Sequence, residues 1–577
     1  MIFRLFIIIK LLFCIVICYA EDNVFSIKKT VDSLDRVQIL PFEDLELAED
    51  DLCIINISTQ QQFDCMLASI KKSISLGEHN IKVHITEGIY QFNEDHINFK
   101  NENYENVSII IEGENAIVTS DNTLKKNITI AKPWEDAYWA DSLILVNEGN
   151  NICFIPYKNK WSNDIKQKYK KLKIPQCYKS VDYPIVEINE SGIYFKAKDL
   201  FVVENRLRKS YNVNYDYVYH GEGVRFLLYN EDSTIGCKAS TFMRLANSHF
   251  KLMKIRGLIF DRNKDEGALI SINNIEADQI NISDCSFTNI RGTVVYFSHC
   301  DHIAFKNNIV KDIMRNGVFV SDGCIDVHIT NNLFENCGQS LSNTFCIRCN
   351  EADYYIAENK FVDFGYGAIG LGLWYGEKKK AVSRGIVEYN EIYYTPSYKA
   401  NYWKRTLMDS GAIYTWTQND GIIMRYNYIH DITGMWENRG IFCDDGASNL
   451  KIYCNILLNI DNYYYIDSRS VKDNVTNYRN NENNLIAYNI VEGPICYMGY
   501  DTENRHCIKG VNFMVETGRK LSVENKICNL EIQEKDVPLK GCKALENNLI
   551  VPLKYADFLD NLLCDKYIGK IIKISRK

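Results

Sequence analysis

A short unit that recurs nine times in the second half of the chain constrains the fold more than any other feature. Each unit has an apolar residue, two variable residues, a slot residue, one variable residue and a second apolar residue, as in residues 329–334. The slots lie 23 to 37 residues apart, and in chain order they are Leu258, Cys285, Asn308, Asn332, Asn359, Asn390, Asn427, Asn455 and Asn489. Because one unit is too small to bury its own apolar face, the units must stack, and the pattern predicts a solenoid.

Asn suits the slot because it tolerates a left-handed backbone and its side chain can hydrogen-bond neighbouring peptide groups. The slot is therefore expected at a tight bend, with its side chain turned into the coil. At the ~4.8 Å spacing of stacked strands, such side chains form a ladder. We predict that the seven Asn slots share one column.

The repeat resembles the right-handed parallel β-helix of the pectate-lyase-like superfamily, most strongly over residues 245–500. Residues 81–92 and 107–116 resemble the first strands of the same family. A leucine-rich repeat needs a strict Leu-x-x-Leu-x-Leu period, which is absent. The resemblance implies an all-β fold, a right-handed parallel β-helix solenoid with a small β-rich insertion and a Cys-containing C-terminal cap.

Five segments follow from this interpretation. Residues 1–20 form a signal peptide, 21–129 an N-terminal cap with the first coils, and 130–244 a β-rich insertion that breaks the coil pattern. The main β-helix occupies 245–500. Residues 501–577 form a disulfide-pinned cap over the open strand edges, with the cysteines Cys507, Cys528, Cys542 and Cys564.

The N-terminus is typical of a secretory signal. Arg4 and Lys10 precede a short apolar run that ends at Ala20. The alternative, a membrane anchor, is disfavoured because Lys10 splits the apolar run, which leaves too little to span a bilayer. The expected product is a secreted monomer that is not inserted in a membrane. Its 64 basic residues (66 minus two) against 74 acidic ones disfavour nucleic acid as a partner.

Cysteine usage agrees with secretion. Twenty cysteines minus the two in the signal leave eighteen, an even number that favours disulfides over metal ligands. Most of the eighteen are expected to be oxidised, whereas Cys285, Cys324 and Cys454 are candidates for buried thiols. Glycosylation sequons occur at Asn56, Asn106, Asn127, Asn189, Asn281 and Asn474.

Acidic residues in two neighbouring units are the candidate catalytic groups: Asp409, and the pair Asp444 and Asp445. Aligning Gly411 with Gly440 places the two segments on the same strand of adjacent coils, with Trp416 beside Asp445. We therefore expect the carboxylates to converge on one column. If Phe442 points into the coil, strand alternation sends Asp445 to the groove, which favours Asp445 over Asp444. The alternative is that all three aspartates cap turns.

These segments, with residues 427–431 between them, resemble β-helical carbohydrate-active proteins that show a D-x-G-A-I-Y-T-W … N-x-I-H-D … G-I-Y-L-D-D/E-G-x-S arrangement. Cys443 departs from that pattern, since an aliphatic residue is usual there. The group includes glycoside hydrolases with paired acids. The resemblance implies cleavage of a glycosidic bond in an oligo- or polysaccharide, with one carboxyl protonated and the other ionised.

Residues around the acids are candidates for binding the sugar. Trp403, Tyr414 and Trp416 can form an aromatic platform, although packing between coils is the alternative for each ring. Arg439 and Arg469 can orient hydroxyl groups, with Asp467 beside them on the following coil. His430, followed by Asp431, can serve as a base or as a hydrogen-bonded turn residue.

Two other function classes remain open. A polysaccharide lyase with this fold needs Ca²⁺, Arg or Lys to stabilise an enolate, and Lys404, Arg405, Arg425 and Arg439 are available for this. The acidic net charge disfavours a polyanionic substrate. The third class is a non-catalytic β-helix that binds glycans or serves as a scaffold. The hydrolase interpretation requires no cofactor and no metal.

Overall fold

The computed structural model describes the parts of the chain that carry the repeat. The described residues are 42–92, 95–120, 137–140, 144–147, 152–156, 171–175, 180–188, 192–196, 224–229, 241–263, 267–338, 344–372, 384–399, 410–433, 438–460, 464–469, 471–473, 477–479, 483–487, 489–493, 495–498, 508–509, 513–516, 543–544 and 549–552. No helix within these residues is long and apolar enough to cross a membrane.

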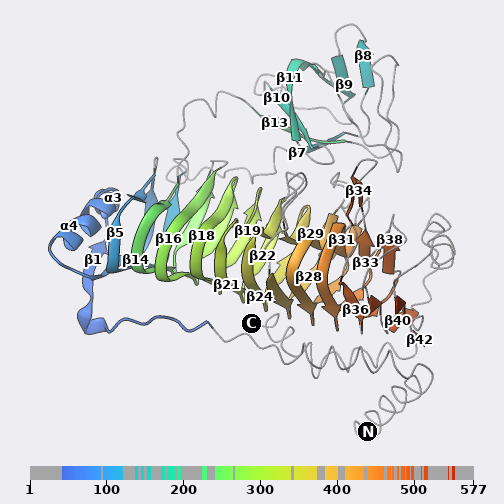
Figure 1. Cartoon of the computed structure of the whole chain (residues 1–577). Coiled ribbons are helices and arrows are strands. Elements are labelled where there is room, and N and C mark those ends of the chain that lie inside the picture. Colours follow the sequence, from blue (N-terminus) through green and yellow to red (C-terminus); the bar gives the residue numbers. More distant parts are fainter. Residues whose placement is uncertain are drawn as a thin grey trace.

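Parallel strands stack coil upon coil along one axis (Figure 1). The strands of a 20-stranded sheet form two series of parallel pairs, and each series is one face of the β-helix. The two series belong to one sheet because a few long strands take part in both. The joining strands are β14 (Met243–Arg256), β16 (Ala268–Ser283), β18 (Thr293–Lys306), β29 (Ser410–Arg425) and β31 (Asn438–Tyr453).

The first line of pairings, called face 1, runs through the N-terminal halves of the joining strands. Its short strands are β4 (Ile97–Lys100), β20 (Val318–Val320), β23 (Phe345–Cys349), β26 (Gly367–Leu371), β33 (Ile466–Arg469) and β38 (Ile495–Met498). The second line, face 2, runs through the C-terminal halves. Its short strands are β1 (Cys53–Ile57), β2 (Asn80–Ile85), β5 (Asn103–Gly113), β21 (Cys324–Thr330), β24 (Ala352–Ala357), β27 (Arg384–Glu388), β36 (Leu485–Ala487), β39 (Ile508–Lys509) and β41 (Lys543–Ala544).

A separate 13-stranded parallel sheet forms face 3. Its strands are β3 (Gly88–Gln91), β6 (Ala116–Thr119), β15 (Ile259–Asn263), β17 (Ser286–Ile290), β19 (Ile309–Ile313), β22 (Leu333–Cys337), β25 (Lys360–Val362), β28 (Glu391–Tyr393), β30 (Tyr428–His430), β32 (Ile456–Leu458), β37 (Ile490–Val491), β40 (Phe513–Glu516) and β42 (Leu549–Pro552). Parallel strands joined by right-handed crossovers make the chain a right-handed parallel β-helix, as the repeat predicts.

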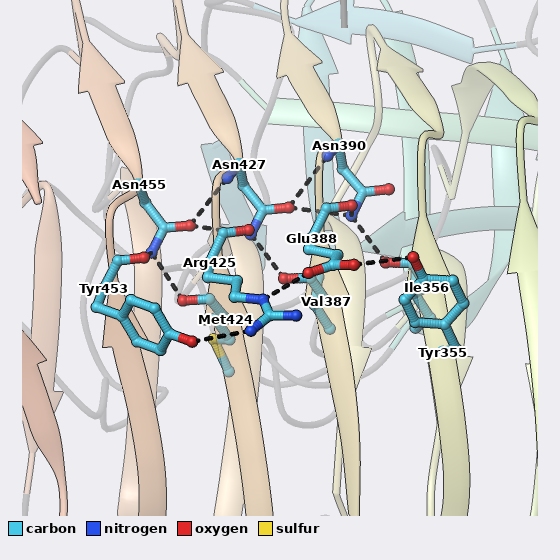
Figure 2. A network of polar contacts seen from close by, with 10 residues as sticks. All are labelled: Tyr355, Ile356, Val387, Glu388, Asn390, Met424, Arg425, Asn427, Tyr453 and Asn455. Carbon is cyan, nitrogen blue, oxygen red and sulfur yellow. Dashed lines mark hydrogen bonds and ion pairs between the residues drawn. The ribbon is translucent and has the colours of Figure 1, made fainter. Parts of the chain in front are cut away.

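The Asn ladder is present as predicted (Figure 2). All seven slot amides are buried, and each Oδ1 accepts the N–H of the slot residue one coil earlier. For Asn427 the acceptor distance is 3.2 Å from the Asn390 nitrogen, and its Nδ2 donates to the Val387 carbonyl at 2.9 Å. One detail differs from the expectation, because the left-handed residue is the one before the slot, such as Tyr426 at φ 56°. The slot Asn contributes its side-chain amide and its backbone N–H to the ladder.

Replacing Asn427 with Ala tests the ladder. We expect the free energy of unfolding to fall by roughly 2–6 kcal/mol, because the buried Asn390 N–H and Val387 carbonyl each lose a partner at about 1–3 kcal/mol. Urea unfolding followed by circular dichroism measures the change. The control is Asn273→Ala, since Asn273 is exposed on a strand of the same β-helix. Equal stability of the two variants would contradict a ladder that stabilises the coils.

The N-terminal end and the segment before β14 have elements of their own. The N-terminal elements are η1 (Glu49–Asp51), α3 (Gln60–Asp64) and α4 (Met66–Ser75), and the last two bury Phe63, Met66 and Ile70 against the first coils. The segment between β6 and β14 carries its own seven-stranded antiparallel sheet. Its strands are β7 (Ala137–Ala140), β8 (Ile144–Asn147), β9 (Ile152–Pro156), β10 (Lys171–Pro175), β11 (Ser180–Ile188), β12 (Gly192–Lys196) and β13 (Val224–Tyr229).

Beyond residue 500, strands β39 to β42 still pair in the two parallel sheets. The cap cysteines Cys507, Cys528, Cys542 and Cys564 lie outside the described residues. The remaining elements are a helical turn and a hairpin: α5 (Pro396–Lys399), β34 (Val471–Asp473) and β35 (Asn477–Arg479).

The cysteines correct a prediction. The ten with described side chains are all free thiols: Cys53, Cys65, Cys285, Cys300, Cys324, Cys337, Cys346, Cys349, Cys443 and Cys454. Ten is more than half of the eighteen cysteines beyond residue 20, so the expectation that most of them are oxidised is wrong. Cys285 and Cys324 fill buried core positions as predicted. Burial raises the pKa of the Cys285 thiol to about 12, which keeps it protonated and unreactive.

Candidate functional site

The register between β29 and β31 decides which of the predicted acids can meet. Ser410 pairs with Asn438 and Trp416 pairs with Asp444. The alignment of Gly411 with Gly440 is therefore wrong by one residue, because Gly411 pairs with Arg439. Asp444 lies six residues beyond Asn438, or ~20 Å at the rise of a β-strand. Asp409 precedes Ser410 and lies outside the described residues, so its convergence with Asp444 stays a prediction.

The direction of the side chains on β31 is also opposite to the expectation. Cys443 belongs to the main core, whereas Phe442 belongs to a second apolar cluster on the outer side of face 1. Alternation along the strand then sends Asp444 outward, and Tyr414 donates a hydrogen bond to its Oδ2 at 2.7 Å. The argument that favoured Asp445 over Asp444 is thus wrong. The Asp445 side chain is outside the description.

The second apolar cluster is a set of stacked rings on face 1. Tyr414 stacks on Trp416 with centroids 4.2 Å apart and on Phe442 at 4.5 Å. Phe345 meets Trp416 edge-on at 5.5 Å and contacts Tyr366 in the same way. Such offset and edge-on contacts are the favoured geometries of aromatic pairs.

Two glycines of the preceding coil make this cluster possible. A Cβ at Gly367 or Gly370 would lie 2.6 to 2.7 Å from the Phe345 ring, which is too close. The ring of Phe345 therefore rests where these two residues have no side chain.

Burial changes the predicted role of the aromatic platform. Trp416 is 0% exposed and Tyr414 is 2% exposed. These rings have no free face on which a sugar could stack, so packing between coils is what they do. Tyr414 still reaches the site through its hydroxyl. Trp403, the third predicted ring, lies outside the described residues.

Arg439 and Asp467 form a buried ion pair close to Asp444 in the sheet. The Arg439 Nε donates to the Asp467 Oδ2 at 2.6 Å, and both side chains are 0% exposed. Asp467 pairs with Phe442 across the coils, and the Arg439 guanidinium carbon lies 3.8 Å from the centre of the Phe442 ring. The pair is enclosed, so neither residue orients substrate hydroxyls as predicted. Arg469 is on the same strand β33, with a side chain outside the description.

His430 belongs to a different face from Asp444. It lies on β30 of face 3, between the rings of Tyr393 and Tyr428 at centroid distances of 4.8 and 4.1 Å. Its Nδ1 is 2.7 Å from Asp431, and its Nε2 is 3.6 Å from Glu391. His430 is therefore a hydrogen-bonded residue at a turn, and it lies on another face than Asp444.

The charge environment of His430 predicts a pH dependence. Burial lowers its pKa, but the hydrogen bonds and charges of Asp431 and Glu391 outweigh burial, and the net pKa is raised. A raised folded-state pKa adds stability below the unfolded value of about 6.5, and this stability is lost as pH rises through the folded pKa. We expect the melting temperature of His430→Gln to fall less than that of the wild type between about pH 6 and pH 9.

The matched control for that comparison is His79→Gln, because His79 is exposed. Parallel melting curves of wild type and His430→Gln over the whole pH range would contradict the role given to His430.

Face 2 carries a second buried charge network that the sequence did not reveal (Figure 2). The Arg425 Nε donates to Glu388 at 2.5 Å, and its Nη1 donates to the Tyr453 hydroxyl at 3.1 Å. The Tyr355 hydroxyl donates to the other oxygen of Glu388 at 2.8 Å. Burial lowers the pKa of Arg425, but Tyr453 and Glu388 raise it further, so the guanidinium stays charged and engaged. The signal was the shared position of Glu388, Arg425 and Tyr453, each of which directly precedes a left-handed residue.

Comparisons with known proteins concern the fold. No family model matches the chain, and no curated protein matches it by sequence. A solved structure titled "Glycoside hydrolase" is similar at 12% identity and a TM-score of 0.47, over 80% of this chain and 96% of that one. A complex of XylC with xylose has 9% identity and a TM-score of 0.32, over 82% and 81%.

A third similar structure is the A-module of the mannuronan C-5 epimerase AlgE4 from Azotobacter vinelandii. It has 9% identity and a TM-score of 0.31, over 78% of this chain and 90% of that one. At these identities none of the three transfers an activity. The strand pairings, the ladder and the three faces establish what the repeat predicted: the chain is a right-handed parallel β-helix protein.

Proposed function

We propose that the protein is a carbohydrate-active enzyme that hydrolyses glycosidic bonds on face 1, with Asp444 as the carboxyl group that contacts the sugar. The observation that carries the proposal is the Asp444 carboxylate, which points away from the core and is held by the Tyr414 hydroxyl at 2.7 Å. A rigid β-sheet below and a fixed hydrogen bond supply the positioning that an acid catalyst needs. The resemblance of residues 409–448 to β-helical glycoside hydrolases points to the same segment.

Hydrolysis of a glycoside requires a second carboxylate. Asp467 is fully buried and bonded to Arg439, which shields it from a substrate. The second role is therefore left to a carboxylate outside the described residues. In this scheme Asp444 protonates the leaving oxygen, and the second carboxylate receives the proton of the attacking water. Tyr414 is a positioning residue for Asp444.

The lyase alternative receives less support. Two of the four basic residues available for it, Arg425 and Arg439, are buried in ion pairs with Glu388 and Asp467. A guanidinium that already balances a buried carboxylate is not free to neutralise a uronate. Lys404 and Arg405 lie outside the described residues.

A panel of neutral and uronic-acid glycans tests the proposal with the purified chain. Release of reducing ends from neutral glycans without an unsaturated product supports hydrolysis. An unsaturated uronate that absorbs in the ultraviolet would identify a lyase. Binding without turnover on every glycan would identify a non-catalytic β-helix and contradict the proposal.

Secretion and glycosylation are part of the same proposal. The signal segment 1–20 lies outside the described residues. Of the sequons, Asn56 and Asn106 are exposed and accessible to a glycan. Asn281 is fully buried and bonded to Asp44, so it is a chance sequon.

A further inference from the structure

An extended segment, residues 42–48, crosses the outer side of face 2 and is here called the strap. It runs beneath the coils, across the strands rather than along them (Figure 1). Glu46 contacts β14, Asp44 contacts β16 and β18, and Phe42 contacts β21. Three coil steps span ~14 Å, and four residues of extended chain also span ~14 Å. The strap is therefore fully extended, and its length over these residues matches the height of the coils that it crosses.

Side chains on face 2 bind every second residue of the strap. The Lys306 Nζ lies 2.6 Å from both oxygens of Asp44, and the Asn281 Nδ2 donates to the same carboxylate at 2.8 Å. The Lys254 Nζ lies 3.4 Å from Glu46. Lys254 is only 4% exposed, although it points away from the core. Two lysines thus meet two acids at the spacing of an extended chain.

The backbone of the strap is also recognised. The Gln279 side chain donates from Nε2 to the Glu43 carbonyl at 2.8 Å and accepts from the Leu45 N–H at 3.1 Å. One amide therefore satisfies a donor and an acceptor on either side of Asp44. At the far end, the Phe42 ring lies 5.1 Å from the ring of His328. Together these contacts define the track: Lys254, Gln279, Asn281, Lys306 and His328.

We propose that the track is a binding surface for an extended acidic peptide of the pattern Phe-x-Asp-x-Glu, which the strap occupies in cis. The backbone readout demands an extended chain, and the paired charges and the aromatic end demand that pattern of side chains. Charge complementarity between the two lysines and the two acids gives the selectivity. The surface lies on face 2, so it is distinct from the site on face 1.

A cis ligand is present at an effective concentration of the order of mM, so it blocks a free peptide. The test uses the full chain with a weakened strap, Phe42→Ala with Asp44→Ala, and a fluorescein-labelled peptide of residues 42–48. Fluorescence anisotropy should show at least tenfold tighter binding to the weakened chain than to the wild type. Adding Lys306→Met should reduce that binding at least tenfold, whereas the control Lys311→Met, in a surface ion pair of face 3, should not.

A second measurement does not depend on the weakened chain. In the wild-type background, Gln279→Ala should increase hydrogen exchange at the Leu45 amide at least tenfold, while amides of the core strands keep their protection. Equal peptide binding to wild type and weakened chain, or binding that is unaffected by Lys306→Met, would overturn the proposal. An unchanged Leu45 amide in Gln279→Ala would overturn it as well.

Discussion

Asp444→Asn is expected to lower the rate of glycoside hydrolysis by about 10²–10⁴-fold, the contribution of a positioned general acid. Asparagine keeps the shape of the side chain and still accepts a hydrogen bond from the Tyr414 hydroxyl, but it has no proton to give to the leaving oxygen. Asp444 is only half-buried, so the melting temperature should change little. Initial rates on the glycan that the wild type cleaves fastest measure the effect.

Two further variants make this result specific. Asp353→Asn is the matched control, because Asp353 forms a surface ion pair with Arg384 on face 2 and should retain full activity. Tyr414→Phe removes only the hydroxyl that holds Asp444, so it should lower kcat with KM nearly unchanged. Full activity in Asp444→Asn would remove this residue from the mechanism.

The fold could be predicted from the sequence because its determinants are local. An Asn slot such as Asn427 forms its hydrogen bonds with its own bend and with the two neighbouring coils. Each repeat therefore predicts by itself that its coil stacks on the next, and seven repeats give this prediction independently. The core positions on either side of the slot follow from the same spacing.

The site resisted prediction because its determinants are not local. A one-residue error in register places Trp416 opposite Asp445 instead of Asp444 and moves every side chain to the opposite face. The exposure of Tyr414 depends on Phe345, which lies two coils earlier in the chain and has room only beside Gly367 and Gly370. No sequence motif around Tyr414 indicates that the Phe345 ring packs against it.

The role of the charged residues also depends on partners that are distant in the sequence. Arg439 and Asp467 are 28 residues apart, and each alone is typical of a substrate-binding residue in a groove. Only the parallel pairing of β31 with β33 shows that they neutralise each other inside the protein. A charged residue that the sequence suggests for ligand binding can instead form an ion pair with a residue of the neighbouring coil.

Arg439→Met should lower the free energy of unfolding by about 3–5 kcal/mol, because it leaves the buried Asp467 carboxylate without its counter-charge. The surface counterpart Arg384→Met, which leaves only the partly exposed Asp353, should cost less than about 1 kcal/mol. Removing both charges with Arg439→Met and Asp467→Leu should restore most of the lost stability, since a buried ion pair contributes little over an apolar pair of similar volume. Urea unfolding of the four proteins measures these differences. Because Asp467 is assigned to structure rather than catalysis, the double variant should also recover hydrolysis; a stable but inactive double variant would instead make Asp467 a catalytic partner of Asp444.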